Sequence, residues 1–165
     1  MGADELSATL WRERRQLDFL LFLLETQLLH LRAGNWHRLN FTATELEKVL
    51  ENLRFESLAR GVEAASLSAE WKAPHHTTLP GLVSAAPPGP WPGLLGEHLQ
   101  GMAELQAKID NAASDNAAAL QAGPPPGAPG PDELADLAVQ ANVGRALAAV
   151  SAASLPSLRD FLGPA

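Results

Sequence analysis

The chain has 165 residues, no cysteine and a net charge of −7 at pH 7, from 19 acidic and 12 basic side chains. The lack of cysteine excludes disulfide frameworks and thiolate metal sites. Acidic residues are spread along the chain, so neither half carries the basic face that a nucleic-acid-binding protein needs, and we expect no nucleic-acid partner.

The first predicted helix runs from about Asp4 to Ala33 and ends at Gly34-Asn35, which suits a left-handed C-terminal cap. Leucines recur along it at steps of three, four and seven residues, the spacing of a coiled-coil seam. This predicted seam contains Arg14 and the leucines Leu10, Leu17, Leu21, Leu24, Leu28 and Leu31. Four further apolar residues lie outside it, so the helix should contact several neighbours, the C-terminal tail or a client among them: Phe19, Phe22, Leu23 and Leu29.

The same helix raises the question of a membrane segment, because ten of the fifteen residues from 17 to 31 are Leu or Phe. A spanning helix needs about 20 consecutive apolar residues. Here Asp18, Glu25 and Gln27 interrupt the run, and the first ten residues lack the pattern of a secretory signal. We therefore expect no stable membrane insertion and a cytoplasmic location.

The second predicted helix runs from Trp36 or Thr42 to Trp71 and follows a short turn, so it should pack antiparallel to the first. For the later start, Thr42 and Glu45 would form a capping box. Its predicted seam is continuous and consists of Leu39, Ala43, Leu46, Leu50, Leu53, Ser57, Arg60, Ala64, Leu67 and Trp71.

Two arginines fall on these seams near the same end of the hairpin, Arg14 on the first and Arg60 on the second. Glu13, Glu56 and Glu63 are close enough in sequence to pair with them. Such charges indicate a frayed end of the bundle, a polar layer that fixes the register of the helices, or an open end where a partner docks, and the sequence leaves these interpretations open.

Residues 72–92 are rich in proline and predict a loop with at most one helical turn. The loop contains His75 and His76, which we interpret as solvated rather than as metal ligands. A third helix is predicted from about Trp91 to Gln121. Its stripe includes Asn116, a residue type that can set register at a seam, together with Leu95, Leu99, Met102, Leu105, Ile109, Ala113 and Leu120.

The sequence GPPPGAPGP at 123–131 has no large apolar residue and predicts a linker. Apolar residues return at helical spacing after it, which a disordered tail would not need. We therefore predict an all-α protein of three parts. Residues 1–122 form a long antiparallel hairpin plus a third helix in a coiled-coil-like three-helix bundle, 123–131 form the linker, and 132–165 form an amphipathic helical tail.

No catalytic arrangement is found along the chain, which has no phosphate-binding loop and no helical metal motif, so we expect a non-enzyme without metal or cofactor. His98 lies beside the third seam and faces either the edge of the core or the surface. The four tryptophans lie near helix ends, where they either cap the core or, at one common end, bind a partner; they are Trp11, Trp36, Trp71 and Trp91.

The layout resembles the flagellar export chaperones of hook-associated proteins, the FlgN-type family, and most closely its actinobacterial members. The resemblance covers nearly the whole chain and rests on four segments, LSATLWRER at 6–14, LLHLRAGNWHRL at 28–39, TELEKVLENLRFESLARGVE at 44–63 and SLPSLRDFL at 154–162.

This resemblance implies a long helical bundle with a mobile C-terminal segment. It also implies a chaperone, monomer or weak dimer, that binds helical ends of the hook–filament junction proteins, prevents early assembly and delivers them to the export gate and ATPase components. The substrate-binding residues would then be Leu134, Leu137, Val143, Leu147, Val150, Leu155, Leu158, Phe161 and Leu162. The long spacer leaves open whether residues 132–150 bind substrate or pack back on the bundle. The alternative function is a non-catalytic coiled-coil adaptor that self-associates.

Overall fold

The computed structural model describes residues 2–74, 77–125, 133–152 and 155–163, and the side chains of 133–135 are left out. These residues form helices and no strand, which confirms the all-α prediction. Four helices are long and two are short, joined with one 3₁₀ turn: α1 (Gly2–Ala33), η1 (Trp36–Arg38), α2 (Leu39–Glu70), α3 (Leu79–Ala85), α4 (Trp91–Ala122), α5 (Glu133–Ala152) and α6 (Leu155–Leu162).

The turn between α1 and α2 follows from a glycine cap. Gly34 has a φ of 76°, and its N–H donates to the carbonyl of Leu31 at 3.4 Å while Asn35 N–H donates to that of His30 at 3.0 Å. This pair of bonds is a Schellman motif, so the predicted C-terminal cap is confirmed. The later start of the second helix is wrong, because α2 begins at Leu39.

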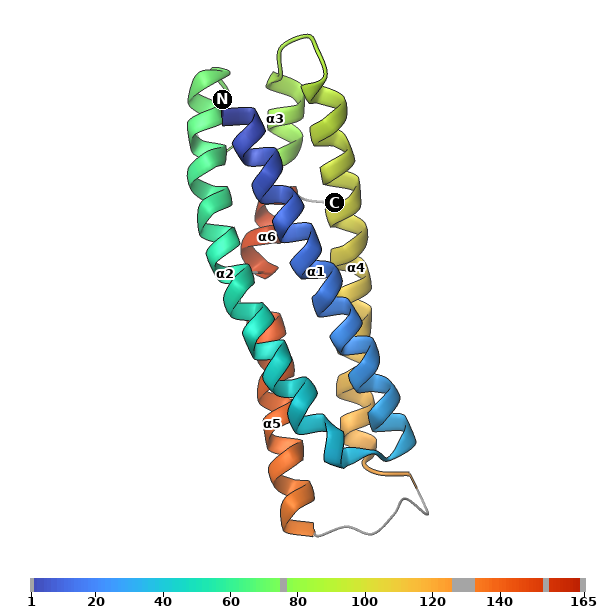
Figure 1. The fold of residues 1–165 in the computed structure, drawn as a ribbon. Helices are drawn as coiled ribbons and strands as arrows, with labels where there is room; N and C mark the ends of the chain where they lie inside the picture. The colour runs from blue at the N-terminus through green and yellow to red at the C-terminus, as the bar shows by residue number, and fades with distance from the viewer. Residues whose placement is uncertain (1, 75–76, 126–132, 153–154, 164–165) are drawn as a thin grey trace.

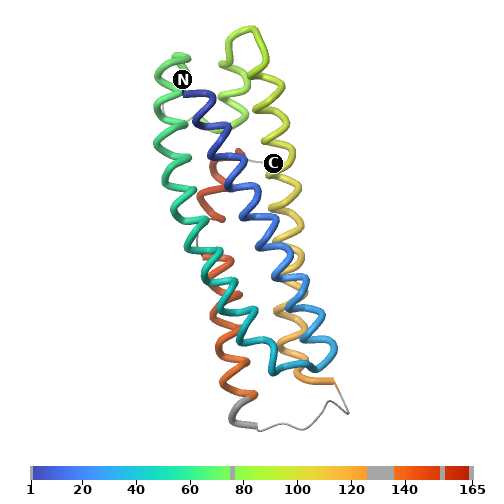
Figure 2. Tube along the Cα trace, viewed as in Figure 1, coloured from blue at the N-terminus to red at the C-terminus, as the bar shows by residue number. Residues whose placement is uncertain are grey.

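The long helices form a bundle in which α1 and α2 are antiparallel and α4 lies along α1 in the same direction (Figure 2). The fourth position of the bundle, between α2 and α4, is shared by three helices end to end: α5, then α6, then α3 (Figure 1). The tail therefore packs back on the bundle, and the expected three-helix bundle becomes one with four positions.

The core of the bundle is built mainly from leucines, and Leu6, Leu10, Leu17, Leu20 and Leu24 are all fully buried. Burying one such side chain contributes about 1.5–3 kcal/mol, so this row is a large part of the stabilisation of α1. The row continues through two polar residues, Glu13 and Gln27, which are 1 % and 0 % exposed.

The predicted first seam is wrong at two positions. One row of buried residues steps by four and three along 6, 10, 13, 17, 20, 24, 27 and 31, so Glu13 replaces Arg14 and Gln27 replaces Leu28, while Leu21 is buried as predicted. Of the four extra apolar residues of α1, Leu23 is buried, whereas Phe19, Phe22 and Leu29 remain 43 %, 60 % and 68 % exposed.

Helix α3 is longer than the single turn expected in the proline-rich loop. The Thr78 hydroxyl caps it by accepting from Gly81 N–H at 3.3 Å, and Pro80 stands in the first turn, where a missing N–H costs little. Leu79 and Leu82 are fully buried, so burial stabilises the second turn. The end of α6 lies here, with an ideal Cβ on Gly163 falling 3.4 Å from Pro80 Cγ.

Candidate helix-binding site

Helices α5 and α6 lie in a groove formed by α2 and α4, which we call the tail groove (Figure 1). Most of the predicted partner-binding residues point into the core: Val143, Leu147, Val150, Leu155, Leu158 and Leu162 are at most 8 % exposed. Of the others, Phe161 is half-buried, Leu137 is 60 % exposed, and the Leu134 side chain lies outside the described part. The amphipathic face predicted for the tail therefore exists and is occupied by the bundle, and its role in binding a partner stays a prediction.

Recesses flank the tail on both sides. One of about 580 Å³ lies between α2 and the tail, beside Leu50, Leu58 and Ala149. Another of about 450 Å³ lies between α4 and the tail, beside Ala117 and Gly144. The buried face of α5 consists of Val139, Val143, Ala146, Leu147 and Val150, so a helical turn of α5 buries less area than one in the leucine row of α1.

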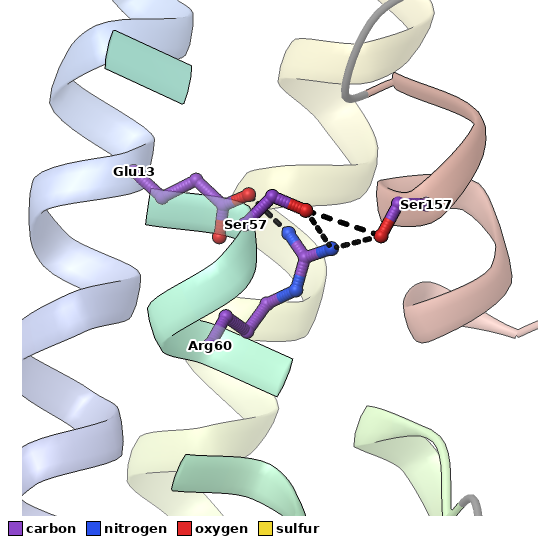
Figure 3. Close-up of polar contacts among 4 residues, drawn as sticks. All are labelled: Glu13, Ser57, Arg60 and Ser157. Carbon is purple, nitrogen blue, oxygen red and sulfur yellow. Dashed lines mark hydrogen bonds and ion pairs between the residues drawn. The ribbon is translucent and has the colours of Figure 1, made fainter. Parts of the chain in front are cut away.

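A buried ion pair lies under α6, between Glu13 of α1 and Arg60 of α2 (Figure 3). Their side chains are 1 % and 3 % exposed. The Arg60 Nη1 group donates to Glu13 Oε1, and Nη2 donates to the hydroxyls of Ser57 at 3.3 Å and Ser157 at 2.9 Å. The pairing of Arg60 with Glu13 forms a polar layer at this end of the hairpin, and its role in register or in partner binding stays a prediction.

The same guanidinium also contacts the tail through an aromatic ring. Arg60 Cζ lies 4.9 Å from the centroid of the Phe161 ring, a cation–π distance. Beside this contact, the Ser57 hydroxyl donates to the Ser157 hydroxyl at 3.1 Å. Ser157 of α6 therefore accepts hydrogen bonds from two residues of α2, Ser57 and Arg60. Arg60 thus joins three helices, and residues Ser157 and Phe161 are four positions apart on one face of α6.

Burial dominates the electrostatics of this pair. It raises the pKa of Glu13 from 4.5 to about 7, against the opposing charge of Arg60 and with a further contribution from Glu56. Burial likewise lowers the pKa of Arg60, against the opposing effect of Glu13. The second carboxylate oxygen of Glu13 is buried and has no hydrogen-bond partner among the described residues, so the pair is only partly compensated for its desolvation.

Arg14 lies in a different layer, between α1 and α4. Its Nη1 group donates to His98 Nδ1 at 3.3 Å, which leaves the His98 Nε2 proton for the Ser7 hydroxyl at 3.0 Å. Burial and the nearby Arg14 charge lower the pKa of His98. Trp11 covers the layer, with its ring 5.0 Å from that of His98 and 4.4 Å from Arg14 Cζ. His98 therefore faces the core, and Arg14 does not share the Arg60 site.

The tryptophans differ in their exposure. Trp11 is 53 % exposed and Trp36 is 6 % exposed, while Trp71 and Trp91 are half-buried against the core. Trp71 follows the end of α2 and Trp91 begins α4, and both helix ends lie at the end of the bundle where α1 begins (Figure 1). Trp11 lies in the third turn of α1, so the three tryptophans share one end of the bundle, as predicted. Trp71 and Trp91 pack against the core, whereas Trp11 lies against His98.

A second polar layer, which joins α1, α2 and α4, contains the predicted register residue. Asn116 is fully buried and donates to the carbonyls of Leu24 at 2.9 Å and Ala112 at 2.7 Å. Gln27 donates to Asn116 Oδ1 at 2.9 Å, and Thr42 donates to Gln27 Oε1 at 2.9 Å. Sequence reasoning missed Gln27 and Thr42, although an amide inside a leucine-rich run was a signal for the first.

Within the described ranges, no group of three or more His, Asp or Glu side chains could hold a metal ion. His75 and His76 lie outside the described residues. No helix in the described part of the chain is both long and apolar enough to cross a membrane.

Comparisons with protein-family models, curated proteins and solved structures return no match for this chain.

Proposed function

We propose that the protein is a cytoplasmic export chaperone that binds helical ends of flagellar hook-associated proteins. Binding would keep these clients from assembling early and deliver them to the type III export apparatus. The client class rests on the sequence resemblance, and the mechanism needs only helix association. The chain supplies no catalytic step in this proposal.

The observation that carries the proposal is the docking of an amphipathic helical segment, α5–α6, in a groove of the bundle between flanking recesses. Release of this segment would free two apolar surfaces, the tail face and the tail groove, and each matches the apolar face of a helix. Because α5 buries small side chains, release would cost less than opening the leucine core.

The test is binding of purified hook–filament junction proteins to the full chain, measured by calorimetry. We expect a complex of micromolar affinity or tighter. The double variant Leu155→Ala with Leu158→Ala should tighten it at least about tenfold, because it weakens the docking of the tail that the client displaces. The matched control is Phe55→Ala with Val62→Ala, at side chains 63 % and 71 % exposed on α2. Failure of the unaltered chain to bind any junction protein would overturn the proposal.

The alternative, a self-associating adaptor, is favoured by the exposed apolar side chains on the outer faces of α1 and α2, such as Phe22, Leu29 and Phe55. Light scattering of the same sample distinguishes the two functions. A chaperone of this kind is expected as a monomer or weak dimer, whereas an adaptor would form a stable oligomer that the Phe55→Ala and Val62→Ala control dissociates.

A further inference from the structure

Two charged groups of the tail groove contact α6. Asp110 of α4 forms a half-exposed ion pair with Arg159, whereas Arg60 of α2 is buried. The guanidinium is buried on α2 and held on one side by Glu13, and its other edge donates to the Ser157 hydroxyl of α6 (Figure 3). It also lies over the Phe161 ring of α6. When one edge of a guanidinium is fixed, its remaining N–H groups point in a defined direction. They therefore favour a helix that places a hydrogen-bond acceptor opposite them.

The two partners on α6 make different demands on a docked helix. The hydroxyl at 2.9 Å accepts a hydrogen bond from a buried donor, and a side chain without an acceptor would leave that donor unpaired. The aromatic ring offers a flat face to the cation, which an aliphatic side chain of similar size does not. Between and beside them, Leu155, Leu158 and Leu162 fill the groove.

We propose that Arg60 selects the helix that occupies the tail groove. The fitting partner is an amphipathic client helix that runs parallel to α2 and carries a small hydroxyl residue followed four positions later by an aromatic residue. Ser157 and Phe161 of the chain's own tail are the resident example of this pattern. The inference rests on the proposed function, since the client helix takes the place of α6.

The experiment uses a labelled peptide with the sequence of residues 133–163 and measures its binding by fluorescence anisotropy. The receptor is the full chain with Ser157→Val and Phe161→Leu in its own tail, which weakens the resident competitor. We expect the native peptide to bind at least about tenfold more tightly than a peptide with the same two substitutions. A peptide with Ser151→Val, a change at an exposed position outside the Arg60 contact, should match the native one.

The receptor is then changed at Arg60 itself. Arg60→Lys keeps a positive charge for Glu13 but lacks the fork, so the preference between the native and substituted peptides should fall to about twofold or less. Circular dichroism checks the fold of each receptor. If Arg60→Lys unfolds, the comparison of the peptides on the receptor that retains Arg60 decides the test.

Three outcomes would overturn the inference: equal binding of the two peptides, an unchanged preference with Arg60→Lys, or no peptide binding at all. None of them bears on whether the chain binds a junction protein, which the calorimetric test decides. Conversely, peptide selection by Arg60 without any junction-protein binding would remove the flagellar assignment and retain the selective groove.

Discussion

Glu13 and Arg60 occupy core positions at which a leucine would satisfy the heptad spacing equally well. A buried ion pair seldom adds net stability over apolar residues of the same volume, because two charges lose their hydration. What this pair adds is direction: the fixed guanidinium connects α1 and α2 to a hydroxyl and a ring on α6.

The raised pKa of Glu13 predicts a pH dependence of stability. Since the folded state holds the Glu13 proton up to about pH 7 and the unfolded state releases it near 4.5, stability from this group is present below pH 4.5 and is lost as the pH rises to 7. In Glu13→Gln this loss is absent. The free energy of unfolding of wild type relative to Glu13→Gln should therefore fall between pH 4.5 and 7 and level off above, measured by urea unfolding.

Comparing wild type with Glu13→Gln removes the contribution of His98 to the pH dependence of stability. The lowered pKa of His98 changes stability with pH in the direction opposite to that of Glu13. A lowered histidine pKa gives stability that is present above pH 6.5 and is lost as the pH falls through the folded value. This effect is common to both proteins and cancels in the difference. A difference that is flat with pH, or that favours wild type as the pH rises, would contradict a raised Glu13 pKa.

At the residue scale the sequence predicted one partner of Arg60, Glu13, and missed Ser157 and Phe161. Glu56, also predicted to pair with a seam arginine, pairs instead with Arg12 at 3.2 Å. The burial of Asn116 follows from its seam position.

The α1 seam was misplaced at Arg14 and Leu28 because steps of seven from Leu21 pass through these positions, one residue after the buried Glu13 and Gln27. Gln27 could be recognised from its leucine-rich surroundings, whereas the burial of Glu13 depends on its partner Arg60 on another helix.

Among the three glycines of α4, Gly96 and Gly101 have different surroundings and permit a matched comparison. An ideal Cβ on Gly96 would meet no atom within 4 Å, whereas one on Gly101 would overlap the guanidinium of Arg14, with Cζ at 2.7 Å. We expect Gly96→Ala to stabilise the protein by about 0.5–1 kcal/mol through helix propensity. Gly101→Ala should gain less or destabilise, because Arg14 must leave its contact with His98.

Thermal unfolding of the two variants measures this difference, and Gly93→Ala provides a second open position on the same helix. Equal gains at Gly96 and Gly101 would mean that Arg14 moves aside freely. The layer of Arg14, His98 and Ser7 would then contribute little to the packing of α4 on α1.

At the element scale the three longest helices, α1, α2 and α4, could be predicted because apolar periodicity over some 30 residues is a strong signal. The second turn of α3 could not, because its stability comes from burial of Leu79 and Leu82 against distant residues. The placement of α5 was equally undetermined. Its alanines and valines suit either a free helix or a packed one. The linker sequence at 123–131 does not indicate where the helix that follows it lies relative to the bundle.

At the scale of the whole molecule, three positions of the bundle are each filled by one long helix. The fourth is filled by three shorter helices, α5, α6 and α3. No single backbone runs through that position, and α5 buries mostly valine and alanine side chains, which are smaller than the leucines of the α1 row. Local opening should therefore start there.

We expect amides of α5 and α6 to exchange hydrogen with solvent at least about tenfold faster than those in the middle of α1 and α2, under native conditions. Mass spectrometry of peptic fragments measures this directly. The internal control is α4, which borders the tail groove and should be protected like α1. Uniform protection across all six helices would mean that the tail opens only with the whole protein.

The composite fourth position also has a consequence for synthesis. A ribosome makes α1, α2 and α4 before α5 and α6, and the contact of Ser57 with Ser157 joins residues 100 apart. Helices form within about a microsecond, while translation adds roughly 5–20 residues per second. For seconds, each new molecule therefore presents an empty tail groove. During that interval, a client made nearby would meet no intramolecular competitor.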